Sequence, residues 1–241
     1  MTNLLTELKL KTHVHSCVCC KEEITSNNVF TASGWREVEI SGMCEVCFDN
    51  CTYSVEDKMY VINTMNRDVT SLIKNNESVV LAGGALRTLV DPTDEICDYD
   101  IFLLDQTKLE SVKTYFENLK YNKIFECPQG KLTTYKLNDD KVQIINKRSY
   151  KDCNELIGSF DITACCAAWD GENFYKHRRF ISDVLNKKIN LNTVEYPKAT
   201  LNRIVKYGAK GYKLSRQANE YFLDLISDFT WADDNSEFYI D

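Results

Sequence analysis

The amino-acid sequence predicts a mixed α/β (α+β) protein with a small metal-binding module at its N-terminus and a helical segment at its C-terminus. Two observations lead to this prediction. Between Ser78 and Asp105, two short apolar runs typical of buried strands enclose a Gly-Gly turn and a helix-like segment. Ahead of them, two Cys-x-x-Cys pairs have a spacing typical of zinc sites.

Length and composition limit the class of protein. The 241 residues suffice for one ordinary domain and a small appendage, and the hydrophobic fraction of 44% is typical of a soluble globular protein. No run is long and uncharged enough for a membrane span, and the first residues lack the apolar core of a secretory signal. Eleven cysteines without an export signal favour reduced thiols or metal ligation over disulfides. We therefore expect a cytoplasmic protein, of a cell or of an infected host, with no membrane partner.

The N-terminal region, residues 1–53, is expected to be a zinc-ribbon-like module. The candidate ligands are Cys17, Cys20, Cys44 and Cys47. Each pair on a tight turn can direct two sulfurs to one tetrahedral Zn²⁺, and the stretch between the pairs, 29–40, looks like strand material. A segment this short needs such a structural metal to fold. Free buried cysteines are the alternative, and the spare candidate ligands are Cys19, Cys51, His13 and His15.

The stretch from Ser78 to Asp105 holds the candidate catalytic residues. Its first strand, at Val79, leads into the turn at Gly83-Gly84 and then into the helix-like segment. In the second strand, Asp98 and Asp100 stand two residues apart, so both carboxylates lie on one face. Like charges repel at this distance unless a cation lies between them. Two hard oxygen ligands beside a Gly-Gly turn suit a Mg²⁺-bound triphosphate.

Apolar spacing predicts the elements on either side of this stretch. A helix is expected over 54–75 and another over 108–119, because apolar residues recur there at helical intervals. Alternating residues predict a hairpin with strands at 131–137 and 141–146 and a turn at 138–140.

These motifs resemble the polymerase-β-like nucleotidyltransferases, and most of all the head and neck of tRNA CCA-adding enzymes and bacterial poly(A) polymerases. GGALRTLV at 83–90, followed by DYD at 98–100, is similar to the turn, helix and metal-binding strand of that family. SFDITACCAAWD at 159–170 resembles its RDFTINALAYD motif, with Asp161 and Thr163 matching. Further likenesses, to DLKNKVI and to the neck helix RILRAVRFAAKLGF, lie at 183–189 and 201–214.

The resemblance implies a mixed sheet flanked by helices as the head domain, over 54–190, and a helical segment over 191–241. It implies a transfer of a nucleoside monophosphate from an NTP to a hydroxyl, with release of pyrophosphate. Asp98 and Asp100 would hold two Mg²⁺. Gly83 and Gly84 would cradle the triphosphate, and Arg87 would neutralise it. The acceptor would be an RNA 3′ end of the tRNA kind or a protein hydroxyl.

Two departures from the family pattern bear on this activity. The family has a third carboxylate on a hairpin strand where Gln143 stands here. Either Asp161 replaces it, or the site works with two carboxylates, or the site is not catalytic; we expect Asp161, which could instead cap the helix that follows. At 196–200 the chain also lacks the Asp and Arg with which the family selects CTP or ATP, so faithful CCA addition is not expected.

The charge distribution leaves other functions open. The net charge of −7 argues against indiscriminate nucleic-acid binding, although the segment 175–216 is basic. That segment could serve a polyphosphate or RNA-end substrate, or it could be a solvated helical face. One alternative is a catalytically degenerate nucleotidyltransferase fold that binds nucleic acid or protein. Another is an interaction protein that docks through the zinc module. The small size and degenerate motifs suit a viral protein by analogy.

Overall fold

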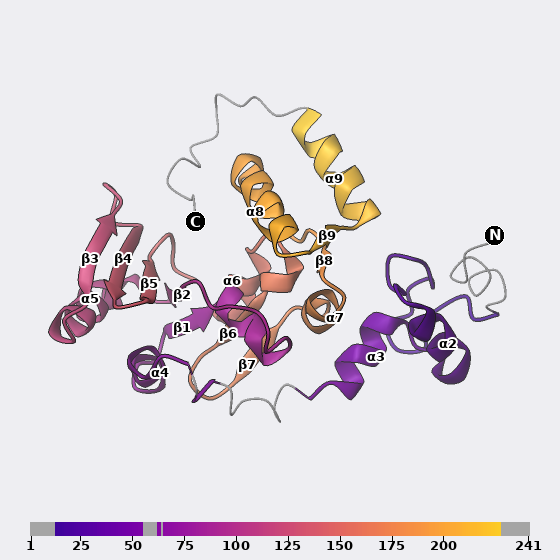
Figure 1. Ribbon diagram of the computed structural model, residues 1–241, viewed down its shortest axis with the longest axis horizontal. Coiled ribbons are helices and arrows are strands. Elements are labelled where there is room, and N and C mark those ends of the chain that lie inside the picture. The colour runs from indigo at the N-terminus through magenta and orange to yellow at the C-terminus, as the bar shows by residue number, and fades with distance from the viewer. Residues whose placement is uncertain (1–12, 55–61, 64, 228–241) are drawn as a thin grey trace.

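A seven-stranded mixed β-sheet forms the centre of the computed structural model, which describes residues 13–54, 62–63 and 65–227 (Figure 1). Its strand order is β3-β4-β5-β2-β1-β6-β7. The strands are β1 (Val79–Ala82), β2 (Tyr99–Leu103), β3 (Asn122–Glu126), β4 (Leu132–Leu137), β5 (Asp140–Ile145), β6 (Ala167–Trp169) and β7 (Phe174–Lys176). Strands β2 and β5 run parallel, and the other neighbours run antiparallel.

Helices cover the sheet and continue beyond it. The α-helices are α2 (Ala32–Ser41), α3 (Glu45–Thr52), α4 (Arg67–Lys74), α5 (Leu109–Asn118), α6 (Cys153–Gly158), α7 (Phe180–Leu185), α8 (Pro197–Ala209) and α9 (Arg216–Ser227). Short 3-10 helices are η2 (Gly84–Leu89), η3 (Gln106–Lys108) and η4 (Thr163–Cys165). A parallel pair, β8 (Lys188–Ile189) and β9 (Lys213–Leu214), lies apart from the main sheet. Within the described residues, no helix has both the length and the apolar character needed to cross a bilayer.

Both faces of the central strand β1 are buried, because its alternate residues belong to two different hydrophobic clusters. Val79 and Leu81 belong to the cluster that includes apolar residues of α4 and α5. Val80 and Ala82 belong to the cluster that includes residues of α6. The continuous apolar run of β1 is thus explained by helices on both sides.

Most of the elements expected around the sheet are confirmed. Both strands of the central stretch are present, the hairpin corresponds to β4 and β5, and the helix at 108–119 corresponds to α5. The helix-like segment after the Gly-Gly turn is the 3-10 helix η2. Of the helix expected over 54–75, only α4 is helical over more than a short turn, and residues 55–61 and 64 lie outside the described residues.

The expectation of strand structure at 29–40 was wrong, because most of this segment forms α2. The Thr31 side chain accepts a hydrogen bond from the Gly34 N–H and so caps the helix. The buried Glu45 carboxylate accepts a second hydrogen bond, 2.9 Å long, from the Thr31 N–H. A Cβ at Gly34 would lie only 2.2 Å from Glu45 Oε2, so this glycine admits the carboxylate. The Thr31 cap and its contact with Glu45 therefore favour a helix over the strand propensity of this segment.

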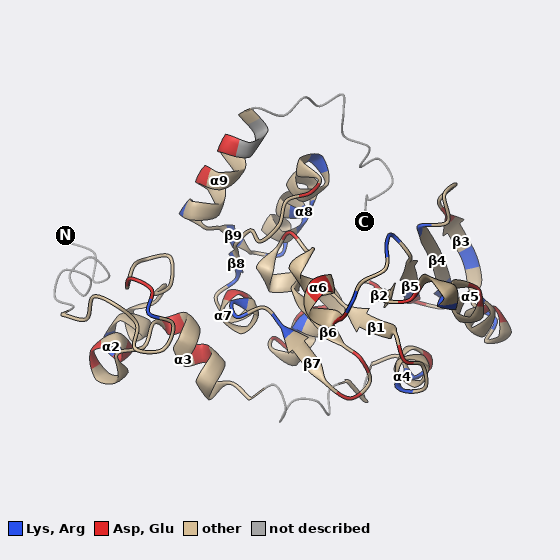
Figure 2. Cartoon of the chain, turned by 180° about the vertical axis from the view of Figure 1, so that it is seen from behind, with Lys and Arg blue, Asp and Glu red and all other residues tan. Residues whose placement is uncertain are grey.

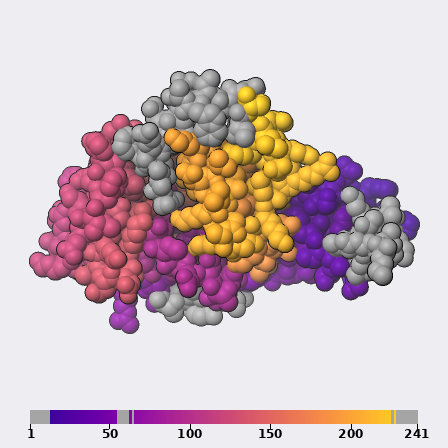
Figure 3. Space-filling model, turned by 45° about the horizontal axis from the view of Figure 1, so that its top comes forward, coloured from indigo at the N-terminus to yellow at the C-terminus, as the bar shows by residue number. Residues whose placement is uncertain are grey.

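The C-terminal helices lie across the middle of the molecule. Figure 3 shows α8 and α9 between the β3–β5 end of the sheet and the N-terminal module. Helix α8 corresponds to the neck helix expected from the resemblance, although it ends at Ala209 and gives way to β9. It thereby reaches over the end of β1 where the Gly-Gly turn begins, and its side chains help to build the site.

Candidate active site and metal centre

Four cysteine sulfurs converge in the N-terminal module. Cys17 and Cys20 lie on one turn, Cys44 precedes α3, and Cys47 lies in the first turn of that helix. All four sulfurs lie within 4.8 Å of one another, and Cys20 Sγ is 3.9 Å from Cys44 Sγ. Thiolates bound to a tetrahedral Zn²⁺ at about 2.3 Å lie roughly 3.8 Å apart. The predicted cysteine set is therefore assembled, and its geometry fits a zinc ion.

Without a cation, the surroundings oppose full ionisation of these thiols. Burial raises the pKa of Cys44 to about 12 and also raises that of Cys47. Burial acts against the Cys17 thiolate too, but backbone N–H groups, led by that of Cys44, hold the Cys17 pKa at about 6. Zn²⁺ would reverse the balance, because a coordinated thiol is deprotonated.

Asp100 lies against the Gly-Gly turn. The antiparallel pairing of β1 with β2 places Ala82 opposite Asp100, so the turn that follows β1 begins beside this carboxylate. Gly83 has a φ of +83°, and a Cβ there would lie 3.3 Å from Asp100 Oδ2. Both the left-handed backbone and the close approach require glycine. The structure thus brings together the turn and one of the two predicted acids.

Asp98 and Asp100 have different partners. Asp98 Oδ2 lies 3.5 Å from Lys141 Nζ, whereas Gln143 stands opposite Asp100 in the parallel pairing of β2 with β5. In the orientation that satisfies its amide, Gln143 donates to Asp100 Oδ1 at 2.9 Å and accepts from Lys141 Nζ at 3.0 Å. The two carboxylates are therefore joined through a lysine and an amide of β5.

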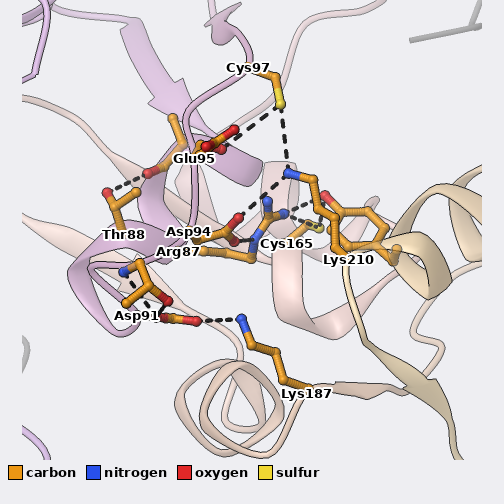
Figure 4. A network of polar contacts seen from close by, with 12 residues as sticks. Arg87, Thr88, Asp91, Asp94, Glu95, Cys97, Cys165, Lys187 and Lys210 are labelled. Atoms are coloured by element: carbon orange, nitrogen blue, oxygen red, sulfur yellow. Dashed lines mark hydrogen bonds and ion pairs between the residues drawn. The ribbon is translucent and has the colours of Figure 1, made fainter.

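Arg87 belongs to η2, which follows the turn, and its side chain joins a network of polar contacts with Asp94 and Cys165 (Figure 4). Its Nε donates to Asp94 Oδ2 at 2.6 Å, and another guanidinium nitrogen donates to the Tyr207 hydroxyl. The guanidinium carbon also lies 4.7 Å from the centroid of the Tyr207 ring. The Arg87 and Asp94 side chains are only 3% and 7% exposed. This guanidinium thus joins η2 to α8, and its contact with a triphosphate stays a prediction.

Several cations of the basic segment 175–216 are engaged in ion pairs. Burial favours the neutral form of Asp94, but Arg87 and Lys210 hold the pKa of this carboxyl below its usual value. Other pairs join Arg178 to Glu22, Lys187 to Asp91, Arg203 to Asp161 and Arg216 to Glu220. Figure 2 shows further basic residues along α8 and at β8 and β9. Part of this charge is therefore neutralised by acids within the fold.

A pocket opens beside Asp100, between the end of the sheet and α8. The Gly-Gly turn and Asp100 form part of its wall. Its cationic lining residues are Lys131, Lys147 and Arg203. Its aromatic lining residues are Phe102, Tyr150, Phe160, Tyr196 and Tyr207. Asp98 is not among the residues that line it. An open pocket with one acid at the turn, several cations and aromatic walls can accommodate a phosphorylated, partly planar ligand.

Asp161 lines the same pocket as Asp100 and is held by α8. Its Oδ2 accepts hydrogen bonds from Thr200 Oγ1 at 2.6 Å and from Arg203 Nε at 2.9 Å. The alternative role as a helix cap is not observed, because η4 begins after Ile162 without a side-chain cap. Its role as the third carboxylate of the site stays a prediction.

Sequence reasoning missed several residues of the site. Lys141 precedes Gln143 by two positions on β5, so its place on the same face could have been inferred from strand geometry. Lys147 and Arg203 offered no such signal, because they reach the pocket from the segment after β5 and from α8. Tyr207, the partner of Arg87, lies 120 residues away in sequence.

Comparison with known proteins places the chain in a family. Residues 46–187 match the model of the "Gad2: Gabija anti-defense 2 family protein". This match covers more than half of the chain. The chain belongs to the Gabija anti-defense 2 family. A curated relative, "Gabija anti-defense 2" of Bacillus phage SPbetaL7, is 26% identical over 165 residues, which are 67% of this chain and 40% of the relative. The chain thus spans less than half the length of that Gabija anti-defense 2 protein.

Solved structures similar to this member of the Gabija anti-defense 2 family include tRNA-processing and CCA-adding enzymes. A tRNA-processing enzyme with CTP has a TM-score of 0.53 at 18% identity and covers 66% of this chain and 46% of its own. The Thermotoga maritima CCA-adding enzyme complexed with tRNA has a TM-score of 0.53 at 12% identity, over 73% and 46% of the two chains. A tRNA nucleotidyltransferase with a primer tRNA and an ATP analogue gives 0.52 at 17% identity, over 66% and 50%. The expected nucleotidyltransferase fold is confirmed.

Proposed function

We propose that this chain is a nucleotidyltransferase that moves a nucleoside monophosphate from an NTP to a hydroxyl, and that this reaction serves the anti-defence role for which its family is named. One observation carries the proposal. The Asp100 carboxylate lies against the Gly83 turn at a pocket that also holds Lys131 and the ion pairs of Lys147 with Glu195 and of Arg203 with Asp161. Backbone amides at a glycine turn, an acid for a metal ion and nearby cations are the groups that a triphosphate needs.

The donor set at the turn fits a hard divalent cation. Asp100 presents a carboxylate oxygen toward the Gly83 backbone, and carboxylate oxygens are the ligands that Mg²⁺ prefers. Mg²⁺ bound there would supply Lewis acidity to a phosphate oxygen and to an attacking hydroxyl. The Gly83-Gly84 backbone would hold the phosphates, and Arg203 would lie on the opposite wall with Asp161.

The aromatic side chains favour a nucleotide over a simple polyphosphate. Phe102 and Phe160 lie with their ring centroids 5.3 Å apart, and both line the pocket. Tyr196, which holds Lys147 Nζ 3.9 Å from its ring centroid, lies on the same lining. Flat apolar surfaces of this kind stack on any base, which agrees with the missing Asp and Arg at 196–200. We propose a donor site with weak base preference.

An RNA 3′ end is the acceptor that we propose, with a protein hydroxyl as the other candidate. Two of the similar solved structures are described as complexes with tRNA, which supports an RNA acceptor by likeness of fold. Lys198 and Lys206 of α8 add positive charge near the pocket, as phosphate contacts to an RNA end would require.

The proposal is tested by incubating the zinc-loaded protein with Mg²⁺, each labelled NTP and either total bacterial RNA or bacterial protein. We expect pyrophosphate release and label on RNA, and Asp100→Asn should abolish both. Asp139→Asn, in the exposed hairpin turn, is the matched control and should behave as the parent. Label on protein and not on RNA would show that the acceptor is a protein hydroxyl. Absence of pyrophosphate release with both acceptors would reject the proposed transfer reaction.

A catalytically degenerate module is the second candidate function. The surroundings of Asp98 and Asp100, called the acidic face below, favour it. Gln143 stands where the family has a carboxylate, and Lys141 is paired with Asp98. This candidate predicts that the protein binds an NTP in the same pocket but releases no pyrophosphate. Equilibrium binding of labelled ATP, measured beside the transfer assay, separates the two candidates.

A further inference from the structure

The acidic face, formed by Asp98 just before β2 and by Asp100 within it, already contains a cation. Lys141 lies two residues before Gln143 on β5, and β5 runs parallel to β2 with Gln143 opposite Asp100. This pairing brings the Lys141 ammonium to 3.5 Å from Asp98 Oδ2. The ammonium therefore offsets the charge of one of the two acids that the sequence assigned to Mg²⁺.

Gln143 fixes both the lysine and the second acid. Its amide oxygen accepts from Lys141 Nζ at 3.0 Å, and its amide nitrogen donates to Asp100 Oδ1 at 2.9 Å. An amide in this orientation turns its donor toward the carboxylate and its only metal-binding atom toward the ammonium, so it is not a metal ligand. Gln143 is also buried, at 4% exposure, which limits its freedom to turn away.

The remaining charge suits one divalent ion. Asp98, Asp100 and Lys141 together carry one net negative charge. Asp100 Oδ2 faces the glycine turn and the pocket, whereas Asp98 does not line the pocket. A second divalent ion at Asp98 would have to displace the Lys141 ammonium or tolerate its repulsion. A single ion at Asp100 requires neither.

We propose that Lys141 replaces a second metal ion in this site: its ammonium neutralises Asp98, and the protein takes one Mg²⁺, through Asp100, for each bound nucleotide. This inference rests on the proposed function only in that the pocket binds a metal–nucleotide complex. It makes Lys141 and Gln143 positioning residues. It also assigns unequal roles to the two acids, with Asp100 as the ligand and Asp98 as the anchor of the lysine.

The test counts ions and does not depend on turnover. Zinc-loaded protein is titrated with Mn²⁺ and a non-hydrolysable ATP analogue, and bound Mn²⁺ is measured by equilibrium dialysis and by electron paramagnetic resonance. We expect one Mn²⁺ per chain, without the spin coupling of an ion pair. Asp100→Asn should weaken Mn²⁺ binding by about 100-fold and Asp98→Asn by less than about tenfold.

Variants of β5 provide the positive control. Lys141→Met combined with Gln143→Glu removes the ammonium and adds a carboxylate, so this protein should bind a second Mn²⁺. Lys136→Met is the matched control, because Lys136 is the exposed neighbour of Lys141 on β4, and it should leave the count at one.

Two outcomes would overturn the inference, and they are distinguishable. Two Mn²⁺ per wild-type chain, or equal losses in Asp98→Asn and Asp100→Asn, would reject the role of Lys141 and leave the nucleotide site intact. Absence of both Mn²⁺ and nucleotide binding in the wild type would reject the proposed function together with the inference. The wild-type count decides in either case, whether or not the double variant folds.

Discussion

The two candidate metal centres of this chain are built in opposite ways. In the N-terminal module, four largely buried cysteine sulfurs lie within 4.8 Å of one another, and backbone N–H groups donate to one of them, that of Cys17. On the sheet, two carboxylates share a lysine and an amide, and only one of them faces the pocket. The sulfur cluster offers all four ligands of a tetrahedral ion, whereas an ion at Asp100 would keep positions open to the pocket.

This difference is the one expected between a structural metal site, at the cysteines, and a candidate active site, at Asp100. When a metal ion fills a closed set of ligands, its binding free energy stabilises the folded state. The N-terminal module depends on this contribution, because its own hydrophobic core contains few residues. An open site on a large sheet does not need its ion to fold, since residues on both faces are buried without it. The following predictions test this contrast, from the largest expected effect to the smallest.

Loss of the thiolate ligands should unfold the module and spare the sheet. In a Cys17→Ser/Cys20→Ser variant, or after chelation, we expect bound zinc to fall from about one ion per chain to none. The module should then unfold, because structural zinc contributes on the order of 10 kcal/mol to the folding of such modules. Elemental analysis and limited proteolysis measure the two effects. Cys51→Ser, an exposed cysteine outside the cluster, is the control. Purified wild-type protein without zinc would contradict the prediction.

Removal of Arg87 should destabilise the sheet domain more than any change at the acidic face. Arg87→Met leaves the buried Asp94 carboxylate without its closest partner, which typically costs about 3–5 kcal/mol. Urea unfolding followed by tryptophan fluorescence would show a lower midpoint. Arg216→Met, which removes an exposed ion pair with Glu220, should change the midpoint little. Equal stability of the two variants would mean that the Arg87 pair is not needed for folding.

Asp161 tests how far the chemistry of the open site extends. If this residue completes the active site, Asp161→Asn should lower transfer by about 10²-fold or more and keep most of the NTP affinity, whereas Gln143→Ala should be mild. Transfer rates and nucleotide binding are measured in parallel with urea unfolding, because Asp161 also holds Thr200 and Arg203 of α8. An Asp161→Asn variant that unfolds, together with a Gln143→Glu variant that gains activity, would move the third position to β5.

The smallest expected effect is a pH dependence at Asp183 on α7, the helix against which α3 of the module packs. Burial raises the pKa of Asp183 to about 6 from its ordinary 3.8, so the folded state binds this proton more tightly than the unfolded state. Stability from this group is therefore present at low pH and is lost as the pH rises from about 4 to 7. Relative to Asp183→Asn, the wild type should lose up to about 3 kcal/mol over this range. Parallel urea midpoints of the two proteins across this range would contradict the shift.

Local signals in the sequence determined much of the scaffold. Apolar runs and alternation located β1, β2 and the β4–β5 hairpin, because a strand buries residues with a period of two. The Cys-x-x-Cys spacing located the sulfur cluster, because each pair occupies one turn of the chain. The Asp-x-Asp alternation indicated Asp100, and the Gly-Gly pair indicated the turn beside it, where Gly83 has a φ of +83° that strains other residues.

Tertiary structure decided which charges meet, and therefore what the site can do. The pairing of Lys141 with Asp98 depends on the parallel contact of β2 with β5, two strands separated in sequence by α5, β3 and β4. Arg87 is buried against Asp94 and Tyr207 of α8, and the start of α2 is held by a hydrogen bond from Thr31 to Glu45. Side chains of one charge look alike in a sequence. Their role is set by the distance to a partner and by the surrounding dielectric, and both are fixed only when distant segments pack together.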